Sequence, residues 1–118
     1  MVSELLFWAM ISAFLTHELD AIKRHEWRVL PLIRSLPEKP AEQCFIWLHL
    51  PLCLALFWFA REGADTLFAK GFSLFAVIHV LLHWLFRKHP AYEFNNVSSW
   101  LIILVTGILG AAHLVLTL

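Results

Sequence analysis

A run of ionisable residues follows directly on an apolar segment near the start of the chain. The stretch reads FLTHELDAIKRHEW over residues 14–27 and places His17, Glu18 and Asp20 within four positions of one another. His17 and Asp20 are three residues apart, so they share one face of a helix. Imidazole and carboxylate groups together suit Zn²⁺ or Fe²⁺. The stretch therefore predicts metal ligands rather than an ordinary polar helix end.

Two further segments supply histidines. The sequence HVLLHW holds His79 and His83, and the earlier LHLP holds His49. His79 and His83 are four residues apart on one helix face, a spacing that lets both imidazoles reach a single ion in helical zinc sites. We therefore predict that these three residues are metal ligands together with His17 and Asp20.

The elements that must position these residues are four apolar segments. With 60% hydrophobic residues and a mean hydropathy of +0.72, the chain is far more apolar than a soluble domain. We predict helices over residues 3–24, 41–60, 67–87 and 96–117, because about 20 apolar residues span a bilayer core and show no period-2 alternation. The expected fold is all-α: one domain, residues 1–118, forming an integral membrane antiparallel four-helix bundle.

Basic residues indicate the orientation of this bundle. Seven lie near the first and third connections, whereas the second holds Arg61 and Lys70. The excess predicts that the first and third connections are cytoplasmic and that both termini lie outside the cytoplasm. The formal net charge of zero gives no basic excess for nucleic acid. Expected partners are the bilayer, a small amphiphilic ligand and, in one alternative, further copies of the chain.

Counting inward from the cytoplasmic helix ends brings the histidines to one depth. At about 1.5 Å per residue, His17, His49 and His79 lie about 10–12 Å deep, and Asp20 and His83 about 6 Å deep. Ionisable groups inside a membrane are expensive and are functional candidates by default. The shared depth favours one metal site in the cytoplasmic leaflet.

Several of these residues have a simpler interpretation when taken singly. Asp20 can pair with Arg24 on the next turn, His49 can be a hydrogen-bonded core residue, and His83 can reach toward the headgroups. We expect His25 and His89 to be solvated. The sequence leaves the roles of these two residues open, along with those of Glu93 and His113; His113 lies too deep to join the cluster.

The first functional hypothesis is a metal-dependent hydrolase. A bound Zn²⁺ or Fe²⁺ lowers the pKa of its water ligand, and Glu18 or Asp20 acts as the catalytic base on an amphiphilic substrate. The second is a b-type haem held axially by His49 and His79 for electron transfer. The third is a transporter or interaction subunit in which the cluster relays protons without a metal.

The segment THELDAIKRHEW, together with LHLP and HVLLHW, resembles a family of small, uncharacterised bacterial membrane proteins with four predicted helices. A weaker similarity is to membrane proteins with an HxxEE motif, although here the run is His-Glu-Leu-Asp. The first resemblance implies a multi-pass protein of the bacterial inner membrane, and it implies no reaction.

Overall fold

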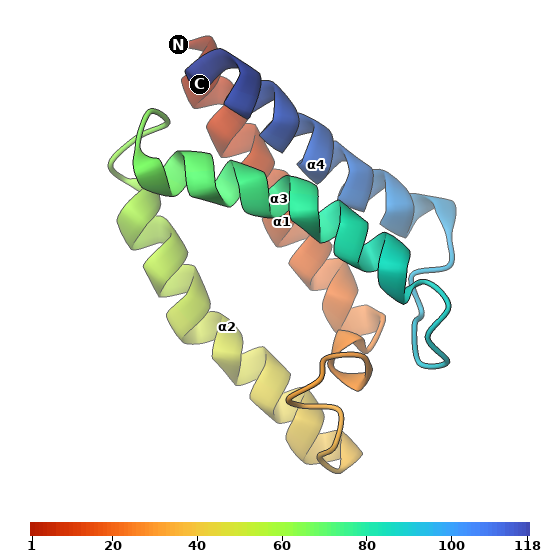
Figure 1. Ribbon diagram of the computed structural model, residues 1–118. Helices are drawn as coiled ribbons and strands as arrows, with labels where there is room; N and C mark the ends of the chain where they lie inside the picture. The colour runs from red at the N-terminus through yellow and green to blue at the C-terminus, as the bar shows by residue number, and fades with distance from the viewer.

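The computed structural model describes all residues from 1 to 118 and contains only helices. They are α1 (Val2–Lys23), the short 3₁₀ helix η1 (Glu26–Arg28), α2 (Glu38–Ala60), α3 (Leu67–Phe86) and α4 (Val97–Thr117) (Figure 1). The four long helices, of 20 to 23 residues, are long and apolar enough to cross a membrane. The predicted all-α class with four long helices is confirmed.

Side-chain caps fix the starts of two of these helices. The Thr66 hydroxyl accepts a hydrogen bond from the Ala69 N–H (3.1 Å) at the start of α3. The Asn96 side chain accepts one from the Ser99 N–H (2.8 Å) at the start of α4. Each cap satisfies one of the backbone donors that a helix leaves free in its first turn.

Helix α4 packs against both α1 and α3 along much of its length (Figure 1). Glycines allow the close approach to α3. A Cβ added at Gly110 would lie 2.7 Å from the Ser73 carbonyl oxygen, and one at Gly107 would lie 2.4 Å from a methyl of Val80. Small residues at such positions are the usual way for apolar helices to approach closely.

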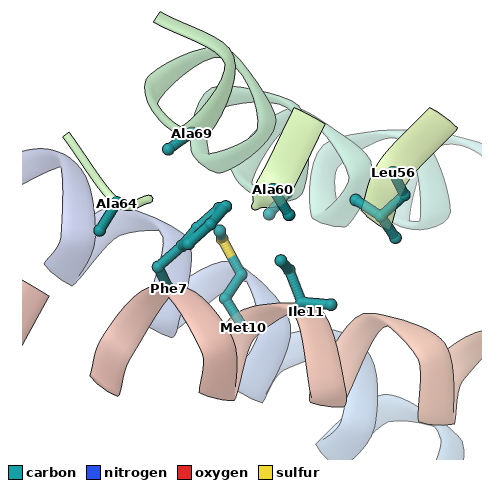
Figure 2. Packing of buried hydrophobic residues seen from close by; sticks show 8 residues of the cluster. Phe7, Met10, Ile11, Leu56, Ala60, Ala64 and Ala69 are labelled. Atoms are coloured by element: carbon teal, nitrogen blue, oxygen red, sulfur yellow. The ribbon is translucent and has the colours of Figure 1, made fainter. Parts of the chain in front are cut away.

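Helix α2 stands apart from this three-helix unit and contacts the rest of the chain mainly near its two ends (Figure 1). An apolar cluster at each end of the molecule makes these connections. Figure 2 shows the first, made of Phe7, Met10, Ile11, Leu56, Ala60, Ala64, Ala69 and Ala76. The second contains Ala21, Trp27, Ile33, Ala41, Phe45, Tyr92, Phe94 and Ile103. The polar residues of interest lie between the two clusters.

The outer surfaces of the long helices carry many large apolar side chains. Leu50, Leu85 and Ile108 are each more than 60% exposed, and only 26 of the 118 residues are buried. Exposed apolar surface on this scale is unusual for a soluble monomer. The helix surfaces are therefore compatible with contact to lipid.

Candidate metal centre

Three histidines from two helices meet in the interior between the apolar clusters. His17 comes from α1, and His79 and His83 come from successive turns of α3. Their ring centroids lie 4.6 Å (His17–His79), 4.9 Å (His17–His83) and 4.6 Å (His79–His83) apart. One nitrogen from each ring lies within 4.8 Å of the other two. We call His17, His79 and His83 the three-histidine group, and its geometry could hold a metal ion.

The group is buried but poorly supplied with hydrogen-bond partners. His17 is fully buried, yet neither of its ring nitrogens has a partner, and Nδ1 of His79 has none either. Buried polar groups in proteins are nearly always hydrogen-bonded, since leaving one unpaired costs about 1–3 kcal/mol. Several unpaired nitrogens facing one point are what an ion-binding site requires.

Glu26 adds a carboxylate to this group. Its Oε2 atom lies 3.6 Å from His17 Nε2 and 3.7 Å from His83 Nε2, and this oxygen is itself buried without a hydrogen-bond partner. Zinc sites combine histidine nitrogens and carboxylate oxygens at about 2.0–2.2 Å from the ion, usually in a tetrahedron. Three neutral imidazoles and one carboxylate form such a donor set.

Glu26 is not predicted from the sequence because a turn, and not helical periodicity, brings it to the site. Glu26 lies nine residues after His17, which on a continuous helix would place it about 180° away around the axis. Helix α1 ends at Lys23, and His25 has a left-handed conformation (φ 55°) that turns the chain back over the helix end. The unusual second His-Glu pair at residues 25–26 was the only available signal.

A tyrosine orients one of the ligands. The hydroxyl of Tyr92, in the connection between α3 and α4, lies 3.0 Å from His83 Nδ1, which leaves Nε2 facing Glu26. Burial and the nearby Glu26 carboxylate raise the pKa of Tyr92, so this residue stays a neutral hydroxyl. Partners of this kind fix the ring orientation of metal-binding histidines.

Glu18 and His49, two of the predicted site residues, form a hydrogen-bonded pair beside the three-histidine group. Glu18 Oε2 lies 2.5 Å from His49 Nε2, and its other oxygen lies 3.7 Å from His17 Nε2. His49 Nδ1 lies 2.7 Å from the Phe45 carbonyl oxygen, so Nδ1 must carry a proton and donate it. One more proton is then shared between Glu18 and His49, and His49 approaches the group only through Glu18.

The structure places Asp20 away from the three-histidine group. Its carboxylate accepts a hydrogen bond from the Ser99 hydroxyl (2.5 Å) at the start of α4, and one oxygen lies 3.4 Å from Nε of Arg24. These contacts join α1 to α4 and match the simpler interpretation, an ion pair with Arg24.

The remaining histidines have other partners. His25 Nδ1 lies 2.8 Å from Glu93 Oε2, which also accepts a hydrogen bond from Arg28 (3.1 Å). His89 accepts one from the Ala91 N–H within its own loop (3.1 Å). His113 is buried between α4, α3 and the turn that precedes α3, far from the three-histidine group along the chain. Glu93 thus joins the loops above the site without entering it.

Two cavities lie beside the centre. The larger, about 650 Å³, lies between α1, α2 and α3, and Glu18 and His49 are the two polar exceptions in a lining of 13 residues. The smaller, about 110 Å³, is lined on its polar side by Glu26, His79, His83 and Tyr92. The smaller cavity thus borders the three-histidine group directly, whereas the larger one borders it through Glu18.

Fold and site together define an all-α protein with four membrane-compatible helices and a buried histidine group. The chain belongs to a family of unknown function (DUF6713), whose model matches residues 3–118. The predicted resemblance to an uncharacterised family is thus confirmed over nearly the whole chain. Comparisons with curated proteins and with solved structures find no match.

Proposed function

We propose that this protein is an integral membrane metalloprotein in which His17, His79, His83 and Glu26 bind one divalent ion. Zn²⁺ fits the donor set best and Fe²⁺ second, because both accept neutral imidazole with a carboxylate. The observation that carries the proposal is the set of buried ring nitrogens and the carboxylate oxygen that face one another without hydrogen-bond partners.

In the membrane, the helices run antiparallel with both termini outside the cytoplasm. The excess of basic residues in the connections that follow α1 and α3 supports this orientation. It places the metal centre in the cytoplasmic leaflet of a bacterial inner membrane, near the ends of α1 and α3. An ionisable cluster at this depth needs compensation, and a bound cation provides it.

The activity that this centre suits is metal-dependent hydrolysis of an amphiphilic substrate. Zinc in hydrolases binds a water molecule beside its protein ligands, is five-coordinate in some transition states, and lowers the pKa of that water. Glu18 lies on the side of His17 that faces the larger cavity, where it can accept a proton from that water. Asp20, bonded to Ser99 and Arg24, has no part in this step.

The two other hypotheses have less support. Axial haem ligation needs a free nitrogen on both His49 and His79, but both ring nitrogens of His49 have protein partners. A proton relay without metal needs a continuous chain of hydrogen bonds, and His17 makes none. Metal analysis and an absorption spectrum separate all three hypotheses.

The test is elemental analysis of detergent-purified protein. We expect about one Zn²⁺ or Fe²⁺ per chain in the wild type and less than a tenth of that in His79→Ala/His83→Ala. The matched control, His89→Ala, removes a loop histidine whose hydrogen bond stays within its own loop and should keep the ion. Equal metal contents in all three proteins, or none in any, would contradict the proposal, and a Soret band would favour haem.

Glu26→Gln tests the carboxylate separately. The amide keeps the size of the side chain but removes its charge, so the affinity for Zn²⁺ should fall by at least about tenfold. Glu93→Gln, in the loop above the site, is the control and should bind Zn²⁺ as the wild type does. An unchanged affinity in Glu26→Gln would remove Glu26 from the ligand set.

A further inference from the structure

The larger cavity has the form of a binding site for a hydrocarbon chain. Its volume of about 650 Å³ is within the usual range of small-molecule pockets, and 11 of its 13 lining residues are hydrophobic. It exists because α2 stands away from α1 and α3 between the two apolar clusters (Figure 1). We call it the acyl cleft.

The two polar residues of the acyl cleft lie at its boundary with the metal centre. Glu18 lines the cleft and also approaches His17 Nε2 to 3.7 Å. Phe14 of α1 and Phe75 of α3, which also line the cleft, pack against the ring of His79 at centroid distances of 5.8 and 5.5 Å. The apolar space therefore ends at Glu18 and His49, and Glu18 separates it from the three-histidine group.

The charges around the cleft limit the group that can bind at this end. No lysine or arginine lines either cavity, and the carboxylates of Glu18 and Glu26 flank the histidines. Phosphate recognition depends on such basic side chains, and the two carboxylates repel an anion. A neutral carbonyl group needs only the ion as its partner.

From these observations, and resting on the proposed metal centre, we propose that the substrate is a carboxylic ester of a long-chain fatty acid. Its chain occupies the acyl cleft, and its ester carbonyl lies between Glu18 and the ion. The cleft thus sets the substrate class and the metal centre performs the chemistry.

The reaction is an ordinary hydrolysis without redox change. An ion held by the three-histidine group and Glu26 would lower the pKa of the attacking water. The oxygen of this water would form a bond to the carbonyl carbon while Glu18 takes its proton. The bond from the carbonyl carbon to the alkoxy oxygen then breaks, and Glu18 gives the proton to the departing alkoxide. The products are a fatty acid and an alcohol. His49 binds the other oxygen of Glu18 and so holds Oε1 toward the centre.

The experiment uses zinc-loaded, detergent-purified protein and two chromogenic esters, p-nitrophenyl acetate and p-nitrophenyl decanoate. We expect kcat/KM for the decanoate to exceed that for the acetate by at least about tenfold, since each buried methylene favours binding. Glu18→Gln should lower kcat for the decanoate by about a hundredfold or more with its zinc content unchanged.

Two variants of α2 test the position of the chain. Ala55 lines the acyl cleft, so Ala55→Trp should lower the ratio of decanoate to acetate kcat/KM at least about fivefold. Leu54→Trp, one residue away and outside the lining, is the matched control and should keep the ratio. Cys53→Phe narrows the same wall and serves if Ala55→Trp fails to fold.

The outcomes separate the two proposals. Absence of both zinc and iron in the wild type would overturn the metal centre itself. Zinc at one ion per chain with no ester hydrolysis, or with no preference for the longer chain, would overturn the acyl-ester inference and leave the metal centre standing. Full activity in Glu18→Gln would overturn the assignment of Glu18.

Discussion

The protein buries a histidine toward each of its two ends, and the two histidines differ in their hydrogen bonding. At one end, His113 donates from Nε2 to the Ala64 carbonyl (2.8 Å), and its Nδ1 lies 2.7 Å from the Ser73 hydroxyl. At the other end, His17 is equally buried but has no hydrogen-bond partner at either nitrogen. Both rings are fully buried, so burial alone does not distinguish them.

The difference lies in what satisfies each ring. The partners of His113 come from the start of α3 and the turn before it, so this histidine joins α4 to the α2–α3 connection. One nitrogen of each ring in the three-histidine group lies within 4.8 Å of the other two, Glu26 lies 3.6 and 3.7 Å from two of the rings, and neither nitrogen of His17 has a hydrogen-bond partner. The protein itself satisfies both ring nitrogens of His113. In our proposal, a bound ion satisfies those of the three-histidine group.

Metal removal should give the largest contrast between the two ends. An ion present at about a thousand times its dissociation constant stabilises the folded state by about 4 kcal/mol. We therefore expect EDTA to lower the midpoint of thermal unfolding of the wild type in detergent. The His79→Ala/His83→Ala variant, which lacks the site, should show no shift with EDTA. If neither EDTA nor added zinc changed the wild-type midpoint, the proposed contrast between the two ends would be contradicted.

Hydropathy was sufficient to predict the four long helices, because about 20 apolar residues with internal backbone hydrogen bonds leave few alternatives. Depth counting also placed His17 and His79 about 10–12 Å deep and His83 one turn nearer the surface, in one layer of the cytoplasmic leaflet, and the structure brings these three together. Depth along a helix axis does not give the direction of a side chain or the spacing between helices. His49 lies at the same predicted level, yet α2 stands apart and His49 reaches the group only through Glu18.

Asp20 and Glu26 both show the limit of prediction from local spacing. Asp20 was predicted to join the site and has other partners, whereas Glu26 was not predicted and lies at the site. Asp20 shares a helix face with His17 in sequence, but Ser99 of α4 competes for its carboxylate. Glu26 reaches the site through a single left-handed residue, His25, which hydrophobic periodicity does not reveal. Local spacing predicted the candidate ligands that lie within helices, whereas the candidate ligand that depends on a turn, Glu26, was found only in the structure.

His113→Ala should give the second largest effect, which is a loss of stability without a loss of zinc. It leaves the Ala64 carbonyl and the Ser73 hydroxyl without their partner and opens a cavity beside Phe7, which together cost about 3 kcal/mol. Its zinc content should equal that of the wild type. The matched variant His79→Ala should lose zinc, so chemical denaturation and metal analysis of this pair test the comparison. Loss of zinc in His113→Ala would show that the two ends are coupled.

The smallest effect is expected at Asp20. This residue lies close in sequence to the proposed metal ligands, but like His113 it has its hydrogen-bond partners within the protein. Asp20→Ala removes the acceptor of the Ser99 hydroxyl and the partner of Arg24, and the free energy of unfolding should fall by about 1 kcal/mol. Ser99→Ala removes the same hydrogen bond from the other side, so the two losses should not add in the double variant. Zinc content should stay at the wild-type level in all three proteins. A fall in zinc that appears in Asp20→Ala but not in Ser99→Ala would mean that the carboxylate itself, rather than its contact with α4, serves the metal centre.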